Sequence, residues 1–180
     1  ALSANTTADD NTAVGRQTLL ANTTGANNTA LGKSAMTDNT TGESNTAVGI
    51  NCMLANTTGG ENTAVGAYAL DASNSTGNTA VGRSALSALT TGSYNVAVGR
   101  KALESQTTAS DNVAIGNLAL SENTTGTNNV AVGANALDAN TTASNSTAVG
   151  RNALTANTTG AANVAVGSGA LAANTTGTRN

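Results

Sequence analysis

The sequence has no tryptophan, phenylalanine, proline or histidine, and Tyr68 and Tyr94 are its only aromatic residues. Globular cores of this length normally take much of their buried area from large aromatic side chains, so a conventional core is not expected. Without histidine, the chain also lacks the most common general base of enzymes. The absence of proline fits a chain in which every backbone N–H group is needed for pairing with a neighbouring strand.

Charge is scarce as well, at 9% of residues and a net charge of −3. This repulsion is too weak to keep a low-complexity chain expanded, which favours regular repetition over disorder. The few basic residues and the isoelectric point near 4.6 argue against binding to nucleic acid. No apolar run approaches the about 18 residues of a membrane span, and no signal peptide is visible. Cys52 is alone, so it forms no disulfide within the chain and indicates no compartment.

What the sequence does contain is one pentapeptide, Asn-Thr/Val-Ala-Val-Gly, repeated every 17 residues. Its first positions are Asn11, Asn28, Asn45, Asn62, Asn78, Asn95, Asn112, Asn129, Ser146, Asn163 and Asn180. The one exception to this spacing is the interval from Asn62 to Asn78, which is 16 residues. We therefore expect a single solenoid domain over residues 1–180. Residues 1–10 form a partial coil, residues 11–179 form ten coils, and residue 180 begins the next.

Within each copy we number the positions 1 to 17 from the pentapeptide asparagine. Alanine stands at position 8 except for Thr18 and Cys52, and position 4 is Val, Leu or Ile. Position 5 is always glycine: Gly15, Gly32, Gly49, Gly66, Gly82, Gly99, Gly116, Gly133, Gly150 and Gly167. Position 9 is always leucine or methionine: Leu19, Met36, Met53, Leu70, Leu86, Leu103, Leu120, Leu137, Leu154 and Leu171. These two columns are the predicted corner glycines and the predicted structural apolar ladder.

A 17-residue unit is too short for a repeat of two helices. Positions 2 to 4 place β-branched residues at alternate positions, which is typical of a strand, and the small residues at positions 5 and 15 mark turns. The pattern predicts an all-β, parallel β-solenoid with two short strands and two corners in each coil. At about 4.8 Å between paired strands, ten coils would make a rod of roughly 48 Å.

Asparagine is frequent at positions 1 and 12, where stacked copies are expected to form hydrogen-bonded ladders along the rod. The Asn-Thr-Thr triplets also match the N-glycosylation acceptor, but their recurrence at a corner indicates a structural origin. The 16-residue copy predicts a kink or a tightened corner, with Ser73 and Asn74 in altered register.

The leucine column raises the question of self-association. Adjacent residues of a strand point to opposite faces, so Ala at position 8 and Leu at position 9 are not both expected to face inward. If alanine fills the interior, an apolar stripe of leucine lies outside, and copies of the chain should associate around a shared axis. The alternative is a wider, self-sufficient monomer with leucine inside.

The segments Asn95–Gly99, Asn129–Gly133 and Asn163–Gly167 (N-V-A-V-G) and Asn112–Gly116 (N-V-A-I-G) resemble the head repeats of trimeric autotransporter adhesins. Those repeats carry an S-V-A-I-G strand and form a left-handed parallel β-roll in which three chains share one axis. The whole unit is similar to repeats of phage tail-fibre and related surface-fibre proteins. The adhesin repeat is shorter than 17 residues, so the extra residues must enlarge the second half of each coil.

This resemblance implies a left-handed, homotrimeric fibre segment on a cell or virion surface. Its role would be spacing and surface attachment, in a phage tail fibre or a bacterial adhesin stalk or head. The expected partners are further copies of the chain and a host receptor or glycan.

No catalytic, cofactor-binding or metal site is expected. The acidic residues are dispersed over loop positions, and no copy pairs two of them at a spacing suited to general acid–base catalysis. A calcium-binding repeat would carry an aspartate in every coil. Position 6 holds an intermittent basic row that either pairs with acids of neighbouring chains or keeps the rod soluble. Its members are Arg16, Lys33, Arg83, Arg100 and Arg151.

Threonine columns at positions 13 and 14 suggest a second function. Regular threonine columns on a solenoid face are how several ice-binding proteins order water. Because adjacent residues face opposite ways, only one outward column is expected here unless the corner twists. An ice-binding β-solenoid is therefore the alternative to a structural fibre.

Overall fold

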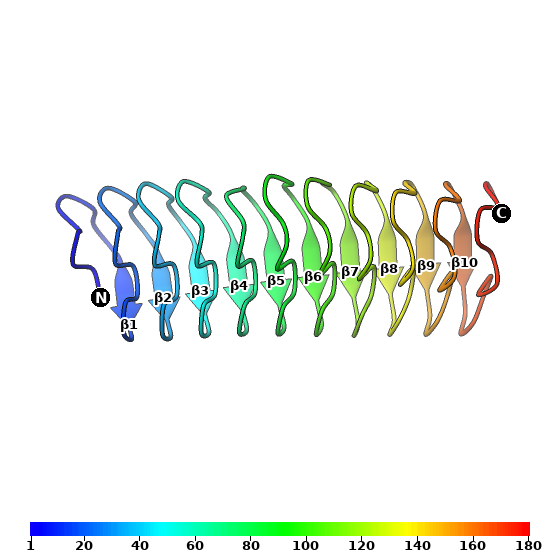
Figure 1. Ribbon diagram of the computed structural model, residues 1–180, viewed down its shortest axis with the longest axis horizontal. Coiled ribbons are helices and arrows are strands. Elements are labelled where there is room, and N and C mark those ends of the chain that lie inside the picture. The colour runs from blue at the N-terminus through cyan, green and yellow to red at the C-terminus, as the bar shows by residue number, and fades with distance from the viewer.

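The computed structural model describes all 180 residues and is a parallel β-solenoid without helices (Figure 1). Ten strands, one from each coil, form a single sheet in the order β1 to β10. The strands are β1 (Thr12–Val14), β2 (Thr29–Leu31), β3 (Thr46–Val48), β4 (Thr63–Val65), β5 (Thr79–Val81), β6 (Val96–Val98), β7 (Val113–Ile115), β8 (Val130–Val132), β9 (Thr147–Val149) and β10 (Val164–Val166). The predicted fold class is confirmed.

Each strand pairs in parallel with the same repeat positions of the next coil, so that alanine at position 3 always lies beside alanine. The 16-residue copy does not disturb this pairing, since Thr63 aligns with Thr79 and Thr79 with Val96. Identical residues therefore stack in straight columns along the whole rod.

The prediction of two strands in each coil is wrong, because the second half of the coil consists of stacked turns. Residues at positions 7, 9 and 17 have a positive φ in nearly every coil, and Leu103 at position 9 has a φ of 54°. Such residues lie in the left-handed region, which interrupts an extended strand. Hydrogen bonds between coils still hold these turns together, as from Leu103 N–H to the Ala119 carbonyl at 3.1 Å.

The same left-handed residues overturn the expectation that alanine and leucine face opposite ways. In the inner coils, positions 3, 8 and 9 are all buried, and they form one continuous apolar cluster that includes Ala102 and Leu103. Strand alternation does not apply at position 9, because its left-handed backbone turns the side chain back into the coil. The leucine column is the core of a single chain and is not an outer stripe available to a partner.

The glycine at position 5 ends each strand in a conformation that only glycine adopts easily. Its φ lies near +139° at Gly116, where an added Cβ would lie 2.5 Å from the Gly133 carbonyl oxygen. Backbone therefore contacts backbone between coils at this corner, which explains why no other residue occurs there.

Both predicted asparagine ladders are confirmed. At position 1, the Asn129 N–H group donates to the Asn112 Oδ1 atom at 2.9 Å, and equivalent bonds run through the column. At position 12, Asn39 Nδ2 donates to Asn22 Oδ1 at 2.8 Å and to the Gly42 carbonyl at 3.0 Å. The inner asparagines of both columns are buried, and the ladders satisfy most of their polar groups. The exception is Asn56 Oδ1, which has no partner because Ser73 replaces asparagine in the next coil.

The 16-residue copy has the tightened corner that its length predicts. In a regular coil, the Thr40 carbonyl oxygen accepts the backbone N–H groups of Thr23, Thr24 and Gly25 from the preceding coil. In the short copy, the side-chain Oδ1 of Asn74 accepts the corresponding N–H groups of Thr57, Thr58 and Gly59, at 3.1, 2.8 and 3.2 Å. A side-chain oxygen thus replaces a backbone carbonyl, and the altered register stays within the corner.

Candidate functional site

The interior of the coil offers no site. It is filled by alanine, leucine and the asparagine ladders. No pocket is found in the structure, and no group of three or more His, Cys, Asp or Glu side chains lies together. Candidate functional residues must therefore lie on the outer surfaces of the rod.

The first surface is the strand face, which we define as the outward side chains at positions 2 and 4 of the ten strands. Position 2 is threonine or valine and position 4 is Val, Leu or Ile, so no charged residue interrupts the face. Along position 4, Val14 is 57% exposed, Ile115 41% and Val166 71%. Position 4 is thus a continuous apolar column that the chain leaves partly exposed, beside a column of threonine and valine at position 2.

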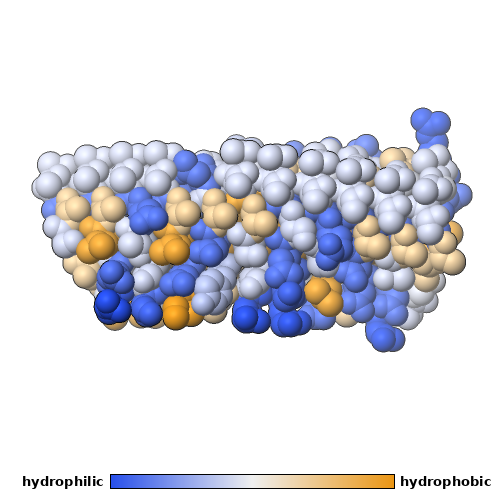
Figure 2. Space-filling model, in the orientation of Figure 1, coloured by the Kyte–Doolittle hydropathy of each residue, from blue (hydrophilic) through white to orange (hydrophobic).

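Two charged edges flank the strand face. The basic edge, at positions 6 and 7 beyond the carboxyl ends of the strands, consists of Arg16, Lys33, Arg83, Arg100, Lys101 and Arg151. The acidic edge, at positions 16 and 17 before the amino ends, consists of Asp9, Asp10, Glu43, Glu61 and Asp111. Arg179, in the last coil, is the one basic residue on the acidic edge. In Figure 2, hydrophilic residues gather along the lower rim, where the strands of Figure 1 end.

The third surface is the threonine corner, at positions 13 and 14. Position 14 is exposed, and position 13 is half-buried in most coils. The position-13 hydroxyl donates to the carbonyl of the same residue in the next coil, as from Thr124 to Thr141 at 3.0 Å. Position 14 is thus the exposed threonine column, and position 13 reaches the surface only in part.

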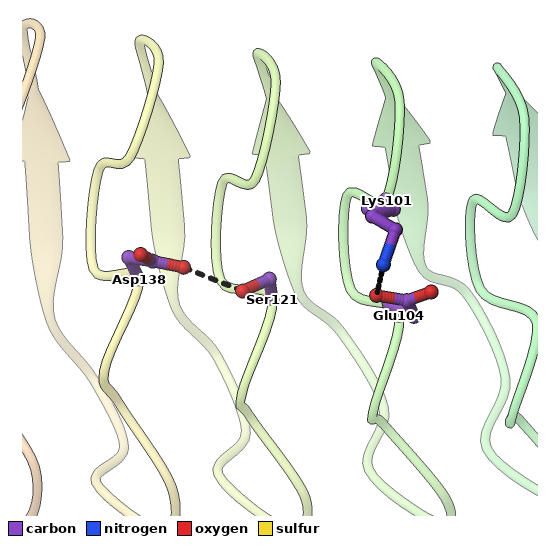
Figure 3. Close-up of polar contacts among 4 residues, drawn as sticks. All are labelled: Lys101, Glu104, Ser121 and Asp138. Atoms are coloured by element: carbon purple, nitrogen blue, oxygen red, sulfur yellow. Dashed lines mark hydrogen bonds and ion pairs between the residues drawn. The ribbon is translucent and has the colours of Figure 1, made fainter.

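The remaining acidic residues lie on the return segment, at positions 10 and 11, which passes in front of the strands in Figure 1. Lys101 Nζ lies 2.9 Å from Glu104 Oε2, and this is the only ion pair in the chain. One coil further on, Ser121 Oγ donates to Asp138 Oδ1 at 2.5 Å (Figure 3). Partial burial raises the pKa of Asp71, whose Oδ1 atom has no hydrogen-bond partner. These carboxylates do not form a cluster. Glu104 and Asp138 each bind one neighbouring side chain, and Asp71 Oδ1 binds none.

Cys52 takes the place of the alanine at position 8 and is a small core residue. Its thiol is buried and donates to the Ala64 carbonyl at 3.2 Å. Burial raises the pKa of Cys52 to about 12, and the nearby Asp71 charge adds to the rise. A thiol in this state is protonated at neutral pH and is a poor nucleophile.

The residues singled out in the sequence thus lie inside the coil or at its corners. The leucine ladder is internal, apart from Leu171 in the last coil, and the corner glycines join the strands to the basic edge. Sequence reasoning does not identify the strand face as the exposed apolar surface. The alternation of positions 2 and 4 is the signal for it, but the leucine column has the larger side chains and predicts the outer stripe.

The triplet asparagines of the inner coils, such as Asn22 and Asn39, are buried with their amides in the ladder, which agrees with the structural origin expected for these triplets. The structure contains no helix that is long and apolar enough to cross a lipid bilayer. Comparisons of the chain with protein-family models, with characterised proteins and with solved structures find no match.

Proposed function

We propose that this chain is a structural and adhesive fibre segment, in which copies of the rod associate laterally through the strand face. The observation that carries the proposal is the uncharged strand face, in which position 4 is apolar in all ten coils and position 2 is threonine or valine. Isolated exposed valines are ordinary, but an apolar stripe along a whole molecule is typical of an interaction surface.

The size of the surface bears on the proposed association. The rod is roughly 48 Å long, and the face together with its two edges is about 20 Å wide, which gives on the order of 900 Å² for each chain. Specific interfaces bury about 800 Å² for each partner, and in a trimer each chain divides its area between two neighbours. The charged edges must therefore take part in the contact.

The proposed assembly is a homotrimer around an axis parallel to the rod. The strand face is straight because its columns stack in register, so three copies could meet along their whole length. The resemblance of the N-V-A-V-G segments to adhesin heads supports the number three and a left-handed coil. It also supports a location on a cell or virion surface, in a tail fibre or an adhesin that spaces and attaches, with a receptor or glycan as partner.

Light scattering at several concentrations tests this proposal. We expect about three times the 17.3 kDa mass of one chain, and 17.3 kDa for the double variant Val81→Glu, Val98→Glu. These residues lie at the centre of the strand face. The control is Thr91→Glu, Thr108→Glu, which places the same charges in the same two coils at the threonine corner and should leave the mass unchanged. A wild-type chain that is monomeric at every concentration would refute the proposal.

Ice binding is a second candidate, favoured by the geometry of the threonine corner. The position-13 hydroxyls are fixed by hydrogen bonds between coils, and the position-14 threonines repeat beside them without any charged residue. Recrystallisation of ice should slow in the presence of the chain and should recover with Thr108→Lys, Thr125→Lys and Thr142→Lys together. Recrystallisation that proceeds equally with and without the wild-type chain would exclude this function.

A further inference from the structure

We infer that the basic edge of one chain docks against the acidic edge of the next, and that this contact selects parallel copies. The inference rests on the proposed self-association through the strand face. The strand face by itself is uncharged and does not select between a parallel and an antiparallel partner. The charged edges supply this selection.

The charges are segregated across the strand face. Six of the seven basic residues lie on the basic edge, which has no acidic residue, and five of the ten acidic residues lie on the acidic edge. Apart from Lys101, which pairs with Glu104, the residues of both edges have no ion-pair partner within the chain. Except for half-buried Lys101, they are exposed as well, so their charges are available to another molecule.

Symmetry decides which edges meet. Two parallel rods that lie face to face are related by a half-turn about an axis that runs between them, parallel to both. This half-turn places the carboxyl ends of the strands of one rod beside the amino ends of the strands of the other. The basic edge then meets the acidic edge. When the rods are antiparallel, basic meets basic and acidic meets acidic, which is repulsive. A ring of three parallel chains repeats the favourable contact at every interface.

The charges also match in height along the rod. Asp10 and Arg16 flank the same strand, β1. Glu61 precedes β4 and Arg83 follows β5, while Asp111 precedes β7 and Arg100 follows β6.

In both of the latter pairs the axial offset is one coil, about 4.8 Å, which a long side chain spans. A slide of two coils would bring other opposite charges level, such as Glu43 with Arg83 and Asp111 with Arg151. The edges therefore select the orientation of the partner and not its axial position.

Energy transfer between labelled chains tests the orientation. In a Cys52→Ala background, Thr24→Cys marks the first coil and Thr159→Cys the ninth, both at the threonine corner, away from the strand face. We expect strong transfer between donor and acceptor chains that are both labelled at residue 24, and weak transfer when one is labelled at 24 and the other at 159. The reverse pattern, or equal transfer in both mixtures, would overturn the inference while leaving self-association intact.

Charge reversal tests the role of the edges. Arg83→Glu with Arg100→Glu should raise the concentration needed for association by about tenfold or more. Adding Glu61→Arg and Asp111→Arg to the same chain reverses the charges that face these two positions and should restore association. The control is Asp38→Arg with Glu122→Arg, on the return segment, which should have little effect.

If the edge variants associate as the wild type does, the edges do not select the partner. If the wild type itself stays monomeric, both this inference and the proposed fibre are overturned.

Discussion

Two unbroken apolar columns run the length of this molecule, leucine at position 9 and valine at position 4. Leu103 and its inner neighbours are fully buried within the chain, whereas Val81 is 36% and Val14 57% exposed. In each coil the two columns lie only five positions apart. Apolar character alone therefore does not determine which of them forms the core.

The difference lies in the backbone. Valine at position 4 belongs to an extended strand whose inward residue is the alanine at position 3, so it must point outward. Leucine at position 9 has a left-handed backbone, which lets it point inward beside the alanine at position 8. The chain thus fills its own interior with one column and presents the other, which is why the strand face is the surface we assign to self-association.

The largest expected effect separates the columns by stability. In the background of Val81→Glu and Val98→Glu, which we expect to be monomeric, Leu137→Ala should lower the free energy of unfolding by about 2–5 kcal/mol through the cavity it leaves. Val132→Ala, in the same coil but on the strand face, should cost less than about 1 kcal/mol. Urea unfolding followed by circular dichroism measures both, and equal losses would contradict the assignment of leucine to the core.

The turn between the columns should be nearly as sensitive. Gly116→Ala forces a side chain into a left-handed backbone against the Gly133 carbonyl and should destabilise the chain by about 1–3 kcal/mol. Gly169→Ala, at position 7 of the last coil, should cost less, because an added Cβ there meets no atom within 4 Å and every other coil has a non-glycine residue at this position. The same unfolding measurement compares the two, and a larger loss at Gly169 would disprove this account of the corner.

The polar ladder beside the leucine column should contribute a smaller amount. Asn39→Ala removes two donated hydrogen bonds and leaves the buried Oδ1 of Asn22 without its donor, at a cost of about 1–2 kcal/mol. Asn117→Ala, at an exposed position 6, is the matched control and should have almost no effect. If both variants unfold at the same urea concentration, the ladder does not stabilise the fold.

We expect the smallest effect on stability at Cys52, where the comparison concerns the reactivity of the thiol. Its buried thiol should resist a thiol reagent at neutral pH, whereas Val65→Cys on the strand face, in a Cys52→Ala background, should react quickly. Comparable labelling rates would show that the interior is open to solvent.

The pKa of Cys52 also predicts how stability depends on pH. It rises from 9.0 to about 12, so the unfolded chain loses this proton first. The stabilising contribution of the protonated thiol is present below pH 9 and is lost as pH rises toward 12. Cys52→Ala should remove this part of the pH dependence, which unfolding curves collected at several values of pH measure.

Much of the architecture was predictable because the repeat is short and regular. The T/V-A-V alternation identified the strands, the invariant glycine identified the corner, and the asparagine columns identified the ladders. The second half of the coil was not predictable in the same way. Leucine is not a residue whose presence indicates a left-handed backbone, so the pattern A-L could not show that both side chains face inward.

The sequence by itself determined a parallel β-solenoid with one coil for each repeat, since a 17-residue period with these columns is satisfied only by stacking equal coils. Only the tertiary structure decided which apolar column is buried. It also decided that Asn74 closes the short corner, because neighbouring coils impose backbone conformations that no single residue prefers. The positions of the two charged edges on either side of the strand face follow from the same stacking, which turns residues scattered along the chain into continuous rows.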